Sequence, residues 1–313
     1  MGNAIRIFFV TDIHGSNHCY RKYLNALKVY NVDVGILLGD LTGKVLVPLV
    51  EKAGGGWETT LMGIHRDINT QEELAELKKT IELLGYYWVH QTPEEFRAYK
   101  DDPMLVDKLF KELMMSRLCE WIDLADERLA GSKYKVYMAP GNDDHFEVDQ
   151  IISDSTAIVN CNNKNVVVGD HEMITFCWAN PTPWNTPREK PDEELEPMLE
   201  ELIATVKDKS NAIFNFHVPP YGFALDLAPE LSKDLVQAAD RKIHVGSRSV
   251  AKMIEKYQPL IGLHGHIHES RGAQKIKKTL IINPGSEYSE GILKGAMIVL
   301  EKGKVKDYVF TSG

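Results

Sequence analysis

Short apolar runs that end in a carboxylate recur early in this chain, and they constrain its fold more than any other feature. Residues 5–10 are apolar and β-rich apart from Arg6, and Thr11-Asp12-Ile13-His14-Gly15 follows them. Residues 32–38 form a second such run, followed by Gly39-Asp40. Apolar runs of this length, bounded by turn residues, predict buried strands. Asp12 and Asp40 are therefore expected at the carboxyl ends of two strands.

A helix is expected between these strands, over residues 17–30. A strand–helix–strand unit with short connections is parallel and right-handed. Both carboxylates then fall at the edge of the sheet where α/β proteins bind ligands. In extended backbone Asp12 and His14 project to the same side. Helix capping is the alternative role for Asp12, but it leaves His14 unexplained.

Three later apolar runs also end in residues that can bind a metal. Residues 135–139 precede Asn142, residues 212–216 end at His217, and residues 259–262 lead into Leu263-His264-Gly265-His266-Ile267-His268. Imidazole is the commonest protein ligand for transition metals, and an Asn carbonyl oxygen suits a hard or borderline cation. Taken singly, Asn142 is also explained by turn chemistry and His217 as a capping or core residue.

Residues 44–131 interrupt this pattern. Residues 44–50 and 57–62 predict a hairpin, and residues 72–84 and 105–129 have the apolar spacing of amphipathic helices. We therefore expect one domain over 1–313 with a mainly helical insertion at about 45–131. Because both ends of the insertion adjoin the carboxylate edge, we expect it to cover that edge. Residues 157–160 and 165–178 are expected as strands of a second sheet.

Composition narrows the class of protein. The 313 residues include 43% hydrophobic and 26% charged residues, and the net charge of −9 gives no support for non-specific nucleic-acid binding. The four cysteines form no C-x-x-C pair, which argues against a zinc knuckle or a redox dithiol. No run approaches the ~18 apolar residues of a membrane span. We expect a soluble cytoplasmic protein without membrane association, and its oligomeric state stays open.

Taken together, the blocks resemble those of the calcineurin-like metallophosphoesterases, which read D-x-H, G-D, G-N-H-D/E, a lone H and G-H-x-H. They occur here in that order from Asp12 to His268. The resemblance implies an α/β fold, a four-layer α/β/β/α sandwich of two mixed sheets flanked by helices. It also implies two metal sites, one formed by Asp12, His14, Asp40 and His268 and the other by Asp40, Asn142, His217 and His266.

The chemistry of such a site supports this interpretation independently. Two cations ~3.5–4 Å apart need a shared anion to offset their repulsion, and Asp40 supplies one. The N/O ligand set suits two divalent ions of Mn, Fe, Ni or Zn, with Mn or Zn favoured over Mg or Ca. The implied activity is binuclear metal-dependent phosphoester hydrolysis, in which a metal-bridging hydroxide attacks phosphorus.

Two alternatives share the fold. The first is a catalytically silent scaffold, and the complete ligand set argues against it. The second is a nuclease, and the acidic charge, with no basic patch that interleaves aromatic residues, argues against it. A small phosphoester is therefore expected as substrate rather than nucleic acid.

The sequence departs from the family pattern at two positions. Asp143 replaces the family histidine that helps to protonate the leaving group or to bind phosphate. Many relatives have an Asp at position 43, where this chain has Gly43 followed by Lys44. Lys44 either balances phosphate charge or is solvated. The catalytic candidates are Asn142, Asp143 and His145.

The first departure carries a prediction about substrate. At its reference pKa of ~3.9, Asp143 is expected to be a carboxylate, which donates protons poorly and repels a phosphate dianion. This predicts a preference for phosphodiesters over monoesters, with His145 as an alternative proton donor.

Overall fold

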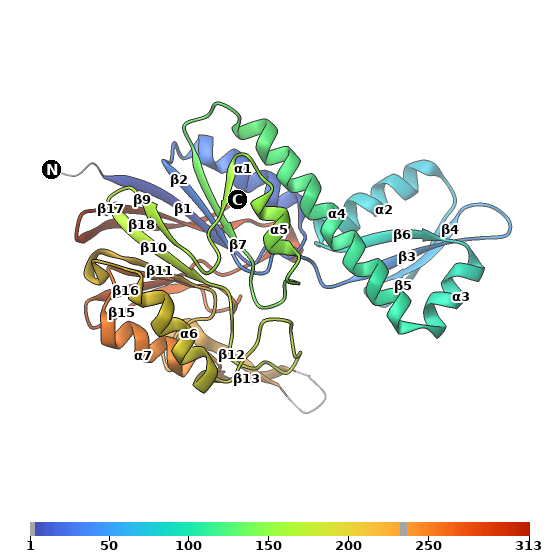
Figure 1. The fold of residues 1–313 in the computed structure, drawn as a ribbon. Helices are drawn as coiled ribbons and strands as arrows, with labels where there is room; N and C mark the ends of the chain where they lie inside the picture. Colours follow the sequence, from blue (N-terminus) through green and yellow to red (C-terminus); the bar gives the residue numbers. More distant parts are fainter. Residues whose placement is uncertain (1–3, 232–236) are drawn as a thin grey trace.

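Two six-stranded sheets pack face to face in the computed structural model, which describes residues 4–231 and 237–313 (Figure 1). The first sheet has the order β18-β17-β1-β2-β7-β8. Its strands are β1 (Ile5–Thr11), β2 (Val34–Leu38), β7 (Lys135–Ala139), β8 (Ile158–Asn160), β17 (Lys294–Glu301) and β18 (Lys304–Ser312). β1, β2, β7 and β8 are parallel, so their carboxyl ends share one edge.

The second sheet has the order β15-β16-β14-β11-β10-β9. Its strands are β9 (Asn165–Val168), β10 (His171–Phe176), β11 (Ile213–Phe216), β14 (Ile261–Leu263), β15 (Gly272–Ile276) and β16 (Thr279–Asn283). The four inner strands are parallel and the two outer strands are antiparallel to them.

Helices cover the outer face of each sheet and complete the four layers (Figure 1). The first sheet is covered by α1 (Asn17–Val29), α5 (Val148–Ser153) and the C-terminal half of α4 (Pro103–Leu129), and the second by α6 (Asp192–Ala204) and α7 (Arg248–Tyr257). The predicted α/β/β/α sandwich of two mixed sheets is confirmed.

Strand β1 shows why its sequence is apolar at nearly every position. Ile7 and Phe9 lie in the core between the two sheets, whereas Phe8 and Val10 lie in the core under the helices. Successive side chains of a strand point to opposite faces, so a strand covered on both faces needs a continuous apolar run. The alternation of apolar and polar residues that marks a half-exposed strand is therefore absent from β1.

The insertion forms a unit of its own beside the sandwich (Figure 1). Its sheet has the order β5-β4-β3-β6. The elements are β3 (Leu46–Glu51), β4 (Trp57–Leu61), β5 (Ile64–Ile68), α2 (Gln71–Leu83), β6 (Tyr87–Gln91) and α3 (Pro93–Asp101). The expected hairpin and helices are present, but β5 and β6 enlarge the hairpin to a four-stranded mixed sheet. Leu49, Leu61 and Ile81 lie in a separate apolar core there.

Helix α4 links this unit to the sandwich. Its C-terminal half contributes Leu118, Trp121 and Ile122 to the core under the first sheet. The ring of Trp121 stacks on Tyr20 with centroids 4.4 Å apart. The second half of α4 therefore belongs to the sandwich, although the sequence analysis assigned it to the insertion.

Two further differences concern short strands. The sequence analysis placed residues 157–160 in the second sheet, but β8 pairs with β7 in the first, because α5 forms a parallel crossover between them. The hairpin of β12 (Leu227–Leu231) and β13 (Gln237–His244) was not predicted. Charged residues interrupt the apolar pattern from which a strand is predicted. Across the described residues, no helix combines the length and apolar composition that crossing a membrane requires.

The packing of α4 gives a stability prediction. Trp121→Ala removes a buried ring and its Nε1–H hydrogen bond to Asn17 Oδ1 (2.6 Å), and it should lower the free energy of unfolding by about 3–5 kcal/mol. Leu105→Ala, on the exposed first half of the same helix, should cost less than about 0.5 kcal/mol. Urea denaturation of both variants measures the difference, and equal stabilities would contradict the assignment of α4 to the sandwich core.

Candidate metal centre

The carboxyl ends of five strands bring the predicted ligands to one place. Asp12, Asp40 and Asn142 follow β1, β2 and β7, which are neighbours in the first sheet. His217 and His266 follow β11 and β14, which are neighbours in the second. Backbone hydrogen bonds hold the loops together, from His14 N to Asp40 O (2.9 Å) and from Gly265 N to His217 O (2.9 Å).

The side chains form two groups that share Asp40. Within each group the potential ligand atoms lie within 4.8 Å of one another, and the groups are Asp12, His14, Asp40 and His268, and Asp40, His217 and His266. His14 Nε2 lies 3.6 Å from Asp40 Oδ2, whereas His217 Nε2 lies 3.4 Å from Asp40 Oδ1. The two oxygens of Asp40 therefore face different groups. The residues of each group fall within one of the two ligand sets that the sequence resemblance implies, although Asp12 Oδ1 lies 3.8 Å from both His217 Nε2 and His268 Nε2.

Asn142 belongs with the second group. Its Oδ1 lies 3.0 Å from His217 Nε2. Its Nδ2 donates to Thr186 Oγ1 (2.8 Å), which directs the carbonyl oxygen toward the histidine. An amide held in this way presents oxygen, not nitrogen, to a cation.

The donor set fits cations because some of its buried ligand atoms, such as Asp12 Oδ1, have no hydrogen-bond donor among the described residues. Asp12 Oδ2 accepts from Thr11 Oγ1 (2.7 Å) and His266 N (3.0 Å), but its buried Oδ1 has no hydrogen-bond partner among the described residues. His14 Nε2 and His268 Nε2 are 3.0 Å apart. A buried carboxylate oxygen without a partner is unfavourable, and a divalent cation between these atoms would satisfy them.

Electrostatics keeps most of the ligands in their metal-binding forms. Burial lowers the pKa of His14, and it lowers the pKa of His266 to about 3, so both imidazoles are neutral. Burial alone would raise the pKa of Asp40, but the charge and hydrogen bond of His217 hold it well below its usual range. Burial likewise opposes a charge on His217, yet Asp40 and then Asp12 raise its pKa to about 9.

The backbone of the centre is strained. Asp12, His14, Asp40 and His266 have φ of 55°, 38°, 33° and 65°. Left-handed backbone is uncommon for residues other than glycine. Such residues persist where the surrounding structure determines them, and they concentrate at functional sites. Four strained ligands in one cluster mark this edge as built for a purpose other than stability.

A second layer of contacts fixes the loop after β7. Asp144 accepts from the backbone nitrogens of Leu41 (2.9 Å), Thr42 (2.9 Å) and Gly141 (2.8 Å). The buried Arg188 donates to the carbonyl oxygens of Asp144 (2.8 Å) and His145 (2.7 Å). The acidic fourth residue of the sequence block therefore joins the loops that carry Asp40 and Asn142.

The three catalytic candidates lie in different surroundings. Asn142 and Asp143 lie at the centre, and Asp143 N donates to Asp40 Oδ1 (3.1 Å). His145 is half-buried, and across the described residues its ring has no hydrogen bond or ion pair to the cluster. Burial and then the charge of Asp40 raise the pKa of Asp143 to about 7, against the opposing charge of Lys44. Cations bound at Asp40 would reverse this shift, because they replace repulsion by attraction.

Tyr288 is a residue of the centre that the sequence analysis did not find. It lies in the one-turn helix Tyr288–Glu290, and its ring centroid is 4.6 Å from that of His14 and 5.9 Å from that of His268. Tyr288 is half-buried, so it forms part of the wall beside the first group. The motif Asn283-Pro284-Gly285-Ser286 at the end of β16 was the available signal, since it places the following residues at the same edge.

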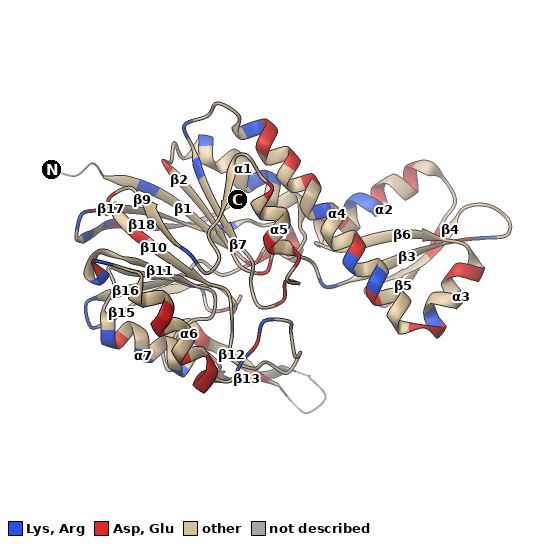
Figure 2. Ribbon diagram, viewed as in Figure 1, with Lys and Arg blue, Asp and Glu red and all other residues tan. Residues whose placement is uncertain are grey.

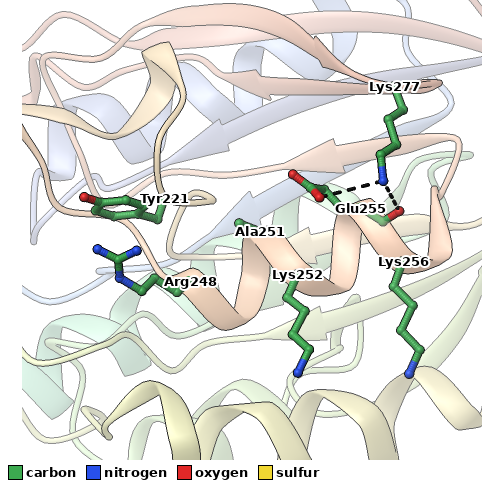
Figure 3. A pocket seen from close by; sticks show the side chains of 7 residues that line it. All are labelled: Tyr221, Arg248, Ala251, Lys252, Glu255, Lys256 and Lys277. Carbon is green, nitrogen blue, oxygen red and sulfur yellow. Dashed lines mark hydrogen bonds and ion pairs between the residues drawn. The ribbon is translucent and has the colours of Figure 1, made fainter.

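A separate hollow of about 490 Å³ lies along α7 and shares no residue with this centre (Figure 3). Arg248 lies over the ring of Tyr221, 3.8 Å from its centroid. The lysines of the hollow have carboxylate partners, in the pairs Lys252–Glu196, Lys256–Glu200 and Lys277–Glu255. Little of their charge is free to attract an anion.

The base of the insertion adjoins the centre. Tyr87 Oη accepts from Gly43 N (3.0 Å), and Arg117 donates to the carbonyl oxygens of Gly15 (3.0 Å) and Tyr86 (2.7 Å). These contacts join β6 and α4 to the loops after β1 and β2. The rest of the insertion extends away from the sandwich (Figure 1), so its contact with the centre is made by its base.

Comparisons with known proteins identify a relative of the chain and structures that share its fold. No family model matches. The uncharacterized protein MJ1162 of Methanocaldococcus jannaschii is 31% identical over 229 residues, which is 71% of this chain and 97% of that protein. TT1561 of Thermus thermophilus has a TM-score of 0.54 at 13% identity, and a further crystal structure has 0.59 at 14%, each covering 99% of both chains. These two structures show a common fold.

Close backbone approach at Gly265 gives a prediction for the centre. A Cβ at this position would overlap Thr11 Oγ1 and Asp12 Oδ2, so Gly265→Ala should displace Asp12 and lower the divalent-metal content after reconstitution several-fold. The control is Gly272→Ala, where a Cβ would meet no atom within 4 Å. Inductively coupled plasma mass spectrometry measures both. Full metal content in Gly265→Ala would show that Asp12 is not needed in its present position.

Proposed function

We propose that this chain is a calcineurin-like metallophosphoesterase, a binuclear metal-dependent phosphoester hydrolase that prefers phosphodiesters. The observation that carries the proposal is the position of Asp40, whose two oxygens face two separate sets of N/O ligands. A carboxylate shared in this way suits a pair of divalent cations. The buried, partnerless Oδ1 of Asp12 supports it further.

The residues present define what each group would hold. Asp12, His14 and His268 would hold one cation with Asp40, and Asn142, His217 and His266 would hold the other. When bound, two such cations act as Lewis acids on phosphoryl oxygens and lower the pKa of an attacking water. Nitrogen and oxygen ligands in this mixture suit Mn, Fe, Ni or Zn, and we favour Mn or Zn.

The chain's own residues bear on the choice of substrate. The family histidine is absent at position 143, so no imidazole is available there to protonate a leaving group. Lys44 offsets the charge of Asp143, because Lys44 Nζ forms an ion pair with Asp143 Oδ2. Burial alone would lower the pKa of Lys44, but the charges of Asp40 and Asp143 raise it above its usual value. An ammonium with a raised pKa is a poor proton donor. The centre is therefore suited to esters with stabilised leaving groups.

Substrate size and cellular location are also part of the proposal. Acidic and basic residues are interspersed along α3 and α4 (Figure 2). This arrangement does not favour binding of a nucleic-acid backbone, so we infer a small phosphoester as substrate. The four cysteines, Cys19, Cys119, Cys161 and Cys177, are free thiols. Free thiols are typical of reducing compartments, which supports a cytoplasmic location.

Metal stoichiometry tests the binuclear centre. Wild-type protein reconstituted with Mn or Zn should hold two ions per chain. Asp40→Asn should lower the occupancy of both sites because it removes the shared charge, and His14→Ala should empty mainly one. The exposed Asp170→Asn is the control and should hold two ions. Stoichiometry near zero in reconstituted wild type would reject the enzyme assignment.

Model substrates test the preference for diesters. Bis-p-nitrophenyl phosphate should be hydrolysed faster than p-nitrophenyl phosphate by the metal-loaded protein. Faster turnover of the monoester would contradict the preference while leaving phosphoester hydrolysis intact.

Two variants test the missing proton donor. Asp143→His should raise activity on esters with poor leaving groups, because general-acid assistance is typically worth ~10²–10⁴-fold. If His145 is instead the acid, His145→Ala should lower the hydrolysis rate by ~10²-fold or more for esters with poor leaving groups and change it little for p-nitrophenyl esters.

A further inference from the structure

The two departures from the family pattern lie against each other. Lys44 follows the β2 loop and Asp143 follows β7, and these strands are neighbours in the first sheet. Lys44 Nζ forms an ion pair with Asp143 Oδ2. From the sequence, two roles were open for Lys44, balancing phosphate charge or being solvated, and Asp143 was expected to be a carboxylate that repels a phosphate dianion. The structure pairs them at the metal centre.

Asp143 is held tightly on its buried side. Its side chain is 13% exposed. Its backbone nitrogen donates to Asp40, and its Oδ1 accepts from Asn142 Nδ2 (3.1 Å). Its Oδ2 lies 3.9 Å from His14 Nδ1. The carboxylate that binds Lys44 is thus fixed relative to ligands of both groups.

The two residues before Lys44 are held by hydrogen bonds, and the Lys44 side chain is partly exposed. Thr42 N and Oγ1 donate to Asp144 Oδ1 (2.9 and 2.7 Å), and Gly43 N donates to Tyr87 Oη (3.0 Å). The Lys44 side chain is 49% exposed. An ammonium carries three donors, so the pair with Asp143 leaves donors for a further acceptor such as a phosphate oxygen.

We propose that Lys44 binds the phosphoryl group of the substrate and that Asp143 positions it. This inference rests on the proposed function, because it needs a phosphoester at the centre. The chemistry is the charge-assisted hydrogen bond of an ammonium to phosphate oxygen. An ion pair that served only to neutralise Asp143 would give the same contact but no role in anion binding, and the two can be separated by experiment.

The experiment is calorimetric titration of the manganese-loaded protein with inorganic phosphate, with metal content measured for every sample. Lys44→Met keeps side-chain length and removes the charge, and it should weaken phosphate binding about tenfold to a hundredfold. Lys44→Arg should retain most of the affinity. Lys52→Met is the control, since Lys52 pairs with Asp67 on the insertion, and its phosphate affinity should equal that of wild type.

Asp143→Asn, made both in the wild-type protein and in Lys44→Met, tests whether Asp143 positions the Lys44 ammonium. With Lys44→Met, the substitution removes an unbalanced negative charge and should strengthen phosphate binding. With Lys44 present, it also frees the ammonium from its partner, so affinity should fall or stay level. Equal changes in the two backgrounds would show that Asp143 acts independently of Lys44.

The outcomes separate the two proposals. If metal-loaded wild type binds no phosphate, the proposed function is wrong. If wild type binds phosphate and Lys44→Met binds it equally well with the same metal content, the inference about Lys44 is wrong and the proposed function stands.

Discussion

Buried charge at one edge of the sandwich is the constraint on which the rest of this structure depends. Asp12 and Asp40 are almost inaccessible to solvent and lie among buried imidazoles. Carboxylates are costly to bury unless they are paired and hydrogen-bonded. The chain offsets part of this cost with hydrogen bonds, which Thr11 Oγ1 and His266 N donate to Asp12 and Asp143 N donates to Asp40. The oxygen of Asp12 without a hydrogen-bond partner among the described residues would be satisfied by a divalent cation.

Several features of the fold exist to keep these groups together. Parallel strands in two facing sheets deliver five loops to the same edge. Four ligands adopt left-handed backbone. A Cβ at Gly141 would overlap Asp40, as one at Gly265 would overlap Asp12. The buried Arg188 then fixes the loop that carries Asn142. Each of these features restricts or strains the backbone, and all of them lie around the candidate metal ligands.

Much of the fold and the ligand set could be predicted from the sequence, because each ligand directly follows an apolar strand. Strand ends are local features, and the order of the blocks is readable without a structure. The pairing of Lys44 with Asp143 could not be predicted, since it depends on two loops far apart in the sequence being adjacent in space. Arg188 and Tyr288 were missed for the same reason. Arg188 belongs to no motif and Tyr288 lies just beyond one, and each reaches the centre through tertiary contacts.

The insertion was predicted less well than the sandwich. Its helices have clear apolar periodicity, but β5 reads Ile-His-Arg-Asp-Ile and is mostly exposed, so no run marks it as a strand. Helix α4 has one continuous pattern, although its C-terminal half lies in the core of the sandwich and its N-terminal half lies beside α3 of the insertion. Periodicity identifies a helix but not its neighbours. The part of the insertion that contacts the centre, around Gly85 and Tyr87, lies between predicted elements and had no signal of its own.

The most direct test of the central claim is anomalous X-ray diffraction from crystals of the manganese-reconstituted protein. The account predicts two anomalous peaks ~3.5–4 Å apart, one on each side of the Asp40 carboxylate, with Asp12, His14 and His268 around one and Asn142, His217 and His266 around the other. A single peak, or two peaks that do not share Asp40, would contradict it.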